Sequence, residues 1–420
     1  MLLRMIIYTL LLLVIPFFAF AQQGDKNSDR RFNFLEQIYL ENDRNQYNEF
    51  LIQNFNEFLL LHPDEEVGSD ILWMLGSLYK IENKPYNSLL AFLKILYFHP
   101  TQAMADSARS QISLLIQRTD NPDLLEKSSL IKEKMESQLP FENKAANHFE
   151  LLSFLFTLQI PGFNKILLKE IDRYRQLYGD RSNKEDVLIF WQGHLNENLK
   201  RFWQASVNYS LLLYLYPHSS LKADALLRSG LIEYKKLGLC EQAAQRFIEI
   251  INSYPGTDIA GEAQFHLGKM NQTVLKNNEE ALNNYQLLID AFPEHARRAE
   301  SMLYSGEILE KEGRYAEAAH YYNMFYRYFS TDPLADKILL KLANLYAKYL
   351  DNPKQAAAIL LTYAGQFPNT PEAPSALYRA AKLYKKTEEK DKAGEICRRL
   401  LEKYPNSSYA NKAMKMLKGL

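Results

Sequence analysis

"RRLLEKYPNSSYANKA", residues 398–413, reads as a helix that ends at Tyr404-Pro405, passes through a turn and begins again. Proline disfavours helical geometry in the residue before it, so a helix normally ends at such a pair. The same aromatic-proline pair recurs at Tyr216-Pro217, Tyr254-Pro255, Phe292-Pro293 and Phe367-Pro368. The break therefore belongs to a pattern that is repeated along the chain.

The break points are evenly spaced. They lie at residues 217, 255, 293, 330, 368 and 405, with Ser330 standing where proline is missing. A spacing of 37–38 residues indicates an array of supersecondary units rather than a single globular core. Pro63, Pro100, Pro140 and Gly179 continue the series toward the N-terminus at intervals of 37–40 residues. The sequence therefore predicts about ten units in one linear array.

Small residues mark two helices in each unit. Twelve residues before each break stands an alanine: Ala205, Ala243, Ala281, Ala318, Ala356 and Ala393. Four residues later, on the same helix face, comes a larger side chain: Tyr209, Phe247, Tyr285, Tyr322, Leu360 and Cys397. The preceding helix has its own small residue: Gly230, Gly268, Gly306, Ala343 and Ala380-Ala381. We predict that these positions form the seam where the two helices of a unit approach closely.

The turns between units carry hydroxyl residues that we expect to cap the next helix: Ser219, Thr257, Thr331, Thr370 and Ser407. In "FPNTPEAP", residues 367–374, Thr370 is the predicted cap and Pro371 takes the first helical position, where a missing N–H costs nothing. The aromatic residue before each proline is predicted to fill the seam between neighbouring units.

The order of small residue, aromatic residue four positions later and proline twelve positions later resembles the tetratricopeptide repeat. "EKEGRYAEAAHYYNMF" (310–325) and "KDKAGEICRRLLEKYPNSSYANKA" (390–413) are similar to its second helix and exit turn. The resemblance extends from about residue 200 to residue 420, and the period exceeds the usual 34 residues. Such longer units are similar to those of exported bacterial tetratricopeptide proteins, among them the Tol-Pal cell-division coordinator and the outer-membrane assembly lipoprotein BamD.

This resemblance implies an all-α fold: an α-solenoid, wound as a right-handed superhelix of helix-turn-helix units. It implies a scaffold for protein–protein interactions in the cell envelope, in envelope assembly or division, and no enzyme activity. First helices of such units line a concave groove that binds a protein or peptide partner. On the last four units the predicted groove residues are Lys269, Gln272, Glu307, Glu310, Asn344, Lys348, Lys382 and Lys385.

The N-terminus has the features of a signal peptide. An apolar run from Met5 to Ala21 follows Arg4 and closes on Ala19-Phe20-Ala21, which places small residues at the cleavage-site positions. We expect cleavage after Ala21 and a periplasmic or secreted protein; the alternative is an inner-membrane anchor formed by residues 5–21. The expected organisation is a signal peptide (1–21), irregular helical repeats (22–180), and a regular array with a C-terminal capping helix (181–420). Two separate solenoid domains are the alternative, because the pattern weakens between residues 120 and 180.

Charge argues against a nucleic-acid partner, since 50 basic residues balance 50 acidic ones. The distribution is uneven: residues 371–420 hold twelve Lys or Arg and six Asp or Glu, which makes this end +6. The solvated face of a terminal helix pair explains such an excess, and a docking patch for an acidic peptide or anionic headgroups is the alternative.

No catalytic, cofactor or metal-binding motif is recognisable in the chain. His62 and His99 each precede a repeat proline, in the slot that Tyr or Phe fills elsewhere, and so have a structural explanation. Cys240 and Cys397 lie four units apart, too far for a disulfide, so two free thiols are expected, with Cys397 buried. The alternative function is a helical-repeat enzyme or carbohydrate-binding protein with its site in the irregular region 101–200.

Overall fold

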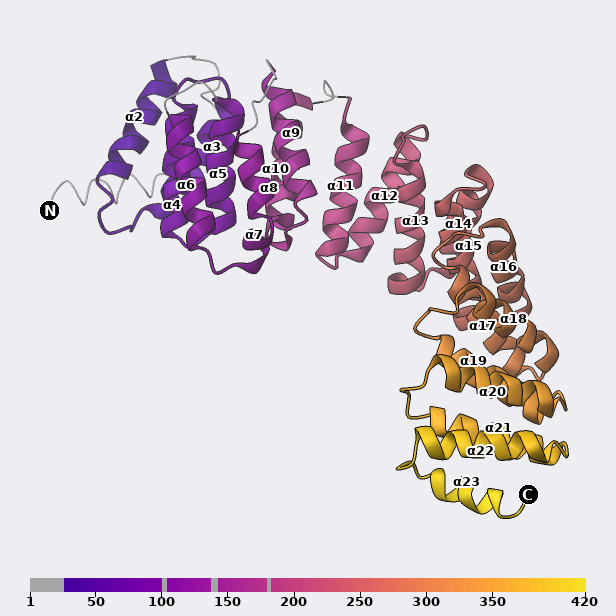
Figure 1. Cartoon of the computed structure of the whole chain (residues 1–420). Coiled ribbons are helices and arrows are strands. Elements are labelled where there is room, and N and C mark those ends of the chain that lie inside the picture. The colour runs from indigo at the N-terminus through magenta and orange to yellow at the C-terminus, as the bar shows by residue number, and fades with distance from the viewer. Residues whose placement is uncertain (1–25, 100–103, 137–142, 180–182) are drawn as a thin grey trace. The chain divides into compact units, whose positions relative to one another are not determined.

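The computed structural model describes residues 26–99, 104–136, 143–179 and 183–420 (Figure 1). Over these ranges it confirms the all-α fold, with 22 α-helices, α2 to α23, and no strand. The predicted signal peptide, Pro100 and Pro140 lie outside the described ranges. Within them, none of the helices is both long enough and apolar enough to span a membrane.

The chain divides into two compact units, Met1–Leu211 and Leu212–Leu420. The described part of the first unit holds α2 (Lys26–Leu40), α3 (Asn48–Leu61), α4 (Gly68–Ile81), α5 (Pro85–Phe98), α6 (Met104–Arg118), α7 (Pro122–Glu126), α8 (Ser128–Glu136), α9 (Lys144–Thr157), the 3-10 turn η2 (Pro161–Phe163), α10 (Asn164–Tyr178), α11 (Glu185–Asn198) and most of α12 (Phe202–Leu215). The predicted division at residues 180–181 and the superhelical winding stay predictions.

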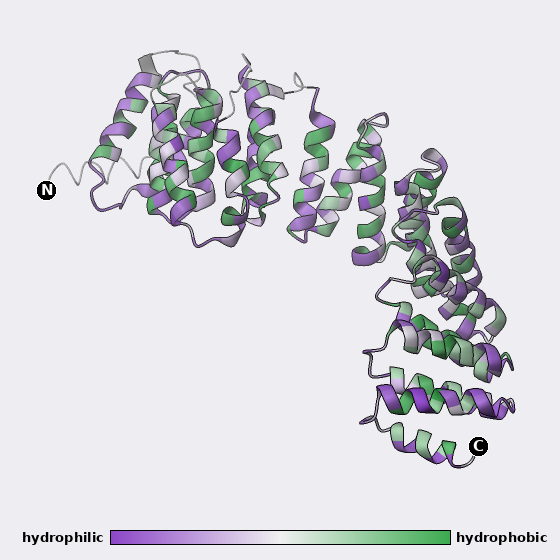
Figure 2. Ribbon diagram, in the orientation of Figure 1, coloured by the Kyte–Doolittle hydropathy of each residue, from purple (hydrophilic) through white to green (hydrophobic). Residues whose placement is uncertain are grey.

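The second unit consists of helix pairs. Its first helices are α13 (Lys222–Ile232), α15 (Asp258–Met270), α17 (Arg298–Lys311), α19 (Ala335–Lys348) and α21 (Ala373–Lys386). Its second helices are α14 (Cys240–Ser253), α16 (Asn278–Ala291), α18 (Tyr315–Tyr328), α20 (Pro353–Gln366) and α22 (Lys390–Lys403), and α23 (Ala410–Leu417) follows. Consecutive helices pack against each other. Figure 2 shows hydrophobic and hydrophilic residues alternating around α22, as expected of a helix with one buried face.

The predicted helix ends are confirmed. Helix α22 ends at Lys403, and Tyr404 leaves helical geometry with φ −133° and ψ 54°. Phe329, which lacks a following proline, takes nearly the same conformation with φ −129° and ψ 44°. His62 and His99 do likewise at the ends of α3 and α5, so they fill the aromatic slot as predicted. The residue at this position therefore leaves helical geometry in the same way with or without a following proline.

The predicted seam is also confirmed. All six alanines and all six larger residues four positions later are fully buried. A Cβ atom added to Gly230, Gly268 or Gly306 would lie within 2.8, 2.9 or 2.4 Å of the ring of the opposite second-helix residue. Where that residue is Leu360 or Cys397, the first helix carries alanine in place of glycine. The small residue thus matches the size of the side chain that it faces.

The predicted cap at Thr370 is wrong. Helix α21 begins at Ala373, with Glu372 as its N-cap residue, so Pro371 precedes the helix. The Thr370 hydroxyl donates a hydrogen bond to the Phe367 carbonyl oxygen at 2.8 Å instead. Thr257 precedes α15 as predicted, but its hydroxyl likewise turns back, to the Tyr254 carbonyl at 2.6 Å. These hydroxyls stabilise the exit turn of the preceding helix, because its last carbonyls lack partners within the helix.

The two cysteines are free thiols and Cys397 is buried, as predicted.

Two first helices in the second unit end in a π-helical turn, η4 (Glu233–Leu237) after α13 and η5 (Asn271–Leu275) after α15. Each π turn closes on a residue with left-handed backbone geometry, Gly238 or Lys276. The π turns recur one period apart and are therefore part of the repeat in this region.

Candidate functional site

Polar side chains link neighbouring first helices of the second unit. Arg297 reaches Glu262 on the preceding first helix, with Nη2 3.2 Å from Oε1. One repeat later in the same unit, Lys341 Nζ lies 3.6 Å from a carboxylate oxygen of Glu307. The Arg379 guanidinium then donates a hydrogen bond to the Asn344 side chain. Partners are 34 or 35 residues apart. We call the surface of α15, α17, α19 and α21 that carries these side chains the first-helix face.

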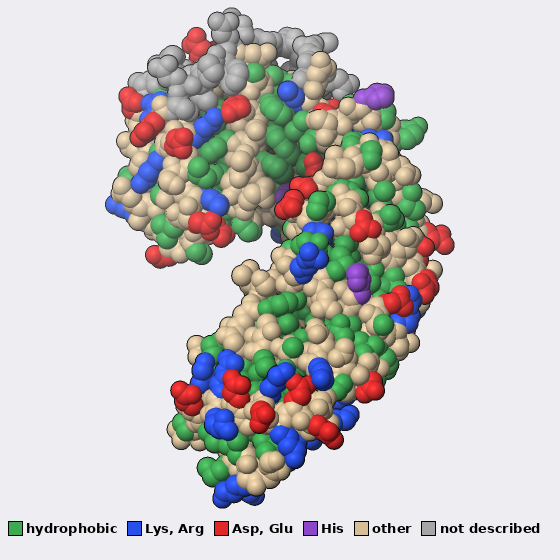
Figure 3. All heavy atoms as spheres, turned by 45° about the vertical axis from the view of Figure 1, so that its right-hand side comes forward, with side chains coloured by type: hydrophobic (Ala, Val, Ile, Leu, Met, Phe, Trp, Pro, Cys, Tyr) green, Lys and Arg blue, Asp and Glu red, His purple; other side chains and the backbone are tan. Residues whose placement is uncertain are grey.

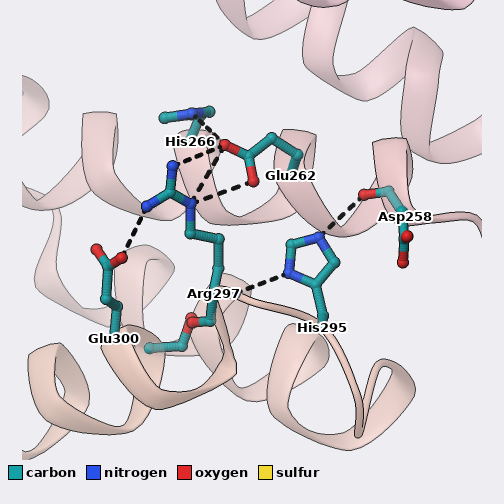
Figure 4. Close-up of polar contacts among 7 residues, drawn as sticks. Asp258, Glu262, His266, His295, Arg297 and Glu300 are labelled. Carbon is teal, nitrogen blue, oxygen red and sulfur yellow. Dashed lines mark hydrogen bonds and ion pairs between the residues drawn. The ribbon is translucent and has the colours of Figure 1, made fainter. Parts of the chain in front are cut away.

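The densest part of this face surrounds Glu262 (Figure 4). Arg297 binds both carboxylate oxygens of Glu262 through Nε, at 3.3 and 3.2 Å, and donates through Nη1 to Glu300 at 2.7 Å. His266, one turn along α15, places Nε2 3.0 Å from Glu262 Oε1. In the turn before α17, His295 holds the Asp258 carbonyl oxygen at 3.0 Å through Nε2 and accepts the Arg297 backbone N–H through Nδ1. The turn is thereby fixed to the preceding unit.

These contacts set the protonation states of the cluster. The hydrogen bond from His266, followed by that from Arg297, lowers the pKa of Glu262 to about 2. Burial lowers the pKa of His266, whose side chain is 5% exposed, so the imidazole is neutral at pH 7. Burial, followed by repulsion from Arg297, also lowers the pKa of Lys235. The cluster is thus a neutral imidazole and a shared carboxylate beneath a guanidinium, an arrangement that fixes helix positions.

Aromatic rings lie beneath two of the cations on this face. The Lys269 ammonium nitrogen lies 3.4 Å from the ring centroid of Tyr304, on the next first helix. The Arg297 guanidinium carbon lies 5.0 Å from the ring centroid of Phe265. Rings in this position attract cations electrostatically. Both side chains are partly exposed, and the ring contacts fix the positions of their charged groups.

The eight residues predicted for the groove occupy two repeat positions. Lys269, Glu307, Asn344 and Lys382 share the first position, and the first three of them contact the neighbouring first helix, as described above. Lys382 is exposed. These four side chains belong to the first-helix face, and their role in binding stays a prediction.

Gln272, Glu310, Lys348 and Lys385 share the second position, and here the units differ. Gln272 accepts a hydrogen bond from the buried Tyr285 hydroxyl at 3.0 Å, and Glu310 accepts one from Tyr322 at 2.8 Å. Lys348 and Lys385 are exposed. The first two side chains therefore serve the seam inside their own repeat, where a buried hydroxyl needs a partner. Glu310 also links to the next first helix, with Oε2 3.2 Å from Lys341 Nζ.

A pairing rule connects the two helices of each unit. Where the second helix carries a tyrosine at the seam, a residue 12 or 13 positions earlier on the first helix accepts a hydrogen bond from the tyrosine hydroxyl. Glu197 accepts one from Tyr209 in the same way, at 3.2 Å. Where the slot is Leu360 or Cys397, which offers no phenol, the same position is lysine. Both lysines are exposed, and Lys385 donates a hydrogen bond to the Gly419 carbonyl oxygen at 2.9 Å.

Sequence reasoning missed Glu262, Arg297, Lys341 and Arg379 as members of this face. A usable signal exists in the sequence, because residues on facing first helices are separated by slightly less than one period. Searching for complementary pairs 34 or 35 residues apart finds both Glu262–Arg297 and Glu307–Lys341. A charge taken alone gives no such indication.

The charge on the face changes along the chain. Acidic residues predominate on α15 and α17, at Glu262, Glu300 and Glu307. Basic residues predominate on α19 and α21, at Lys341, Lys348, Arg379, Lys382, Lys385 and Lys386. Figure 3 shows Lys and Arg side chains among Asp and Glu over the C-terminal end of the second unit. In the part of the chain that the structure describes, no group of three or more His, Cys, Asp or Glu could hold a metal ion.

Solved structures with similar folds have low similarity scores. A tetratricopeptide repeat protein from Parabacteroides merdae is 15% identical, covers 66% of this chain and 100% of its own, and gives a TM-score of 0.38. The C-terminal part of a repeat protein from Cytophaga hutchinsonii is 15% identical, covers 64% and 99%, and gives 0.43. PilF from Pseudomonas aeruginosa is 17% identical, covers 56% and 98%, and gives 0.33. Scores this low support no argument about function.

Family models identify the repeat directly. One tetratricopeptide repeat model matches residues 224–257, 338–370 and 375–407, and a second matches residues 275–333. No curated protein matches the chain in sequence. The resemblance to the repeats of the Tol-Pal coordinator and BamD is not confirmed by these comparisons. Three of the matched segments coincide with the helix pairs α13–α14, α19–α20 and α21–α22, and the fourth spans α16–α18, so the chain contains tetratricopeptide repeats in these segments.

Proposed function

We propose that this protein is an exported scaffold that holds a protein partner in the cell envelope, and that the partner lies along the first-helix face of α15–α21. The observation that carries this proposal is the first-helix face itself. Four successive first helices present charged side chains on one surface, while the buried seams are closed by other residues. Repeat arrays use such extended surfaces to bind peptides.

The order of charges gives the bound segment a direction. A partner segment would place basic residues near Glu300 and Glu307 and acidic residues near Lys348, Lys382 and Lys385. Complementary charge of this kind sets association rate and orientation more than affinity. Lys348 and Lys382 are exposed and accessible to a partner, and Lys385 is exposed while donating a hydrogen bond to the Gly419 carbonyl oxygen.

The envelope location is a proposal that rests on the sequence of residues 1–21, with its apolar run and A-x-A-like end. It makes envelope assembly or division the process to examine first. Export is tested by determining the N-terminus of the mature protein, for which the proposal expects Gln22. An intact Met1 would overturn cleavage after Ala21 and favour the inner-membrane anchor formed by residues 5–21.

Partner binding is tested in two steps. The mature protein is crosslinked in envelope extracts to recover the partner, and association kinetics are then measured with Lys348→Glu/Lys382→Glu/Lys385→Glu. The control is Lys390→Glu/Lys403→Glu/Lys415→Glu, which makes the same charge change at exposed positions on α22 and α23. The proposal expects slower association for the first variant alone, most clearly at low salt. Equal kinetics for both variants would place the binding surface elsewhere.

A further inference from the structure

The first unit contains a small cavity lined by cations. Its volume is about 50 Å³ and its polar lining consists of Lys94, His99, Lys144, His148, Arg173 and Tyr178. These side chains come from the end of α5, from α9 and from α10. No Asp or Glu lies among the described residues that line it.

One cation of the lining, Lys94, is paired with a buried carboxylate behind the cavity wall. Lys94, only 7% exposed, places Nζ 2.6 Å from Glu170 Oε2. Burial lowers the pKa of Lys94 to about 8, and the charge of Lys94 holds the pKa of Glu170 well below its ordinary value, although burial alone would raise it. The two charges cancel each other.

His148 leaves a polar atom unused beside this pair. Its side chain is 1% exposed, and Nε2 lies 3.4 Å from Glu170 Oε2. Nδ1 is buried and has no hydrogen-bond partner. The rings of Phe98, Tyr174 and Tyr178 stand edge-on around the imidazole, with centroids 5.3–5.8 Å away, and fix its position. Because Nε2 faces the Glu170 carboxylate, it carries the ring proton, and Nδ1 is a buried acceptor without a partner. Such an atom marks a place for a water or for a donor group of a ligand.

The outer wall is cationic. Lys144 is 38% exposed and its ammonium pairs with Asp64, which is itself 85% exposed, at 2.8 Å. Arg173 is half-buried and forms no hydrogen bond or ion pair with the residues that the structure describes. Burial raises the pKa of Tyr178 to about 12, so its phenol stays neutral and able to donate. Donors and positive charge therefore surround the space on the outer side.

We propose that this cavity binds a carboxylate group, with Arg173 and Lys144 supplying the charge and the Tyr178 hydroxyl donating a hydrogen bond. Size selects this group: a cavity of this volume accommodates about four waters, and a carboxylate with its attached carbon has four heavy atoms. A guanidinium recognises a carboxylate through two parallel hydrogen bonds. The carboxylate belongs to a small organic acid or to the C-terminus of a partner chain.

Saturation-transfer NMR of the mature protein tests the proposal with sodium acetate as probe and acetamide, which is uncharged and of equal size, as control. We expect saturable binding of acetate and an affinity for acetamide at least about tenfold weaker. Arg173→Gln should lower the affinity for acetate by about tenfold or more. Lys165→Gln, an exposed position on the same helix, serves as the matched variant and keeps wild-type affinity.

Equal affinity for acetate and acetamide in the wild-type protein would overturn the proposal whether or not a variant folds, and so would unchanged acetate affinity in folded Arg173→Gln. Triglycine with a free or amidated C-terminus distinguishes the two sources of the carboxylate. If free triglycine displaces acetate and the amide does not, the source is a chain terminus. If acetate binds and neither peptide displaces it, the source is a small acid. The proposal stands in both cases.

Discussion

Replacing Gly306 with alanine tests the seam in its tightest place. A Cβ atom there would lie 2.4 Å from Cε1 and 2.8 Å from Cδ1 of Tyr322, whereas ordinary contacts begin near 3.4 Å, so the ring must move by about 1 Å. Tyr322 is fully buried and its hydroxyl binds Glu310 at 2.8 Å, so a shift disturbs both packing and that hydrogen bond.

The terms can be compared in magnitude. Overpacking costs about 1–3 kcal/mol, and a weakened buried hydrogen bond costs about 1 kcal/mol. The gain from replacing a helical glycine with alanine is about 0.5–1 kcal/mol. We therefore expect Gly306→Ala to destabilise the protein by about 1–3 kcal/mol. Gly365→Ala is the control, because this helical glycine is exposed and has no atom within 4 Å of an added Cβ. It should leave the stability unchanged or raise it.

Urea denaturation followed by circular dichroism measures both variants, and hydrogen exchange of α17 and α18 localises the effect. Tyr322→Leu in combination with Gly306→Ala reproduces the alanine-leucine pair of Ala343 and Leu360. The double variant should lose less stability than the sum of the two single variants, by about 1 kcal/mol or more. Equal denaturation midpoints for Gly306→Ala and Gly365→Ala, or strict additivity in the double variant, would refute the size-matching of the seam.

The remaining predictions concern burial and charge. Ala318→Phe should destabilise by about 1–3 kcal/mol or more, whereas Lys415→Phe at an exposed position should be nearly neutral in the same denaturation experiment; similar losses would mean that the helix register is wrong. The folded-state pKa of Glu262, about 2, lies below its ordinary value of 4.5, so its stabilising effect is present above about pH 4.5 and lost as the pH falls toward 2. Glu262→Gln should flatten the loss of stability in acid and exposed Glu294→Gln should not; identical acid profiles would contradict this sign. Glu170→Gln should cost about 3–5 kcal/mol, because its buried lysine partner is left unpaired, and a midpoint equal to wild type would refute the buried pair.

The repeat could be predicted from sequence because each landmark has a local cause. Proline disfavours helical geometry in the residue before it, so each aromatic-proline pair ends the preceding helix. A small residue recurs because the same two helices meet in every repeat. The positions of Gln272 and Glu310 were harder to assign, since their polarity fits an exposed groove equally well. Only the tyrosine hydroxyl opposite each of them explains why these residues are acceptors.

The cavity of the first unit could not be predicted from spacing. Lys94, His148 and Glu170 are separated by intervals unrelated to the repeat period, and they meet because α5, α9 and α10 pack together where the pattern is irregular. Sequence periodicity identifies residues that repeat a role, and a site built once in the chain has no second copy to reveal it.

Site-specific photocrosslinking in the native host tests the scaffold function most directly. A photoreactive amino acid is placed at Lys348 or Lys382 on the first-helix face, and at His320 or Glu402 on exposed second-helix positions as controls. The account predicts one shared crosslinked protein from both first-helix positions and none from the controls. Crosslinks only from the second-helix positions, or no protein captured from the first-helix face, would contradict it.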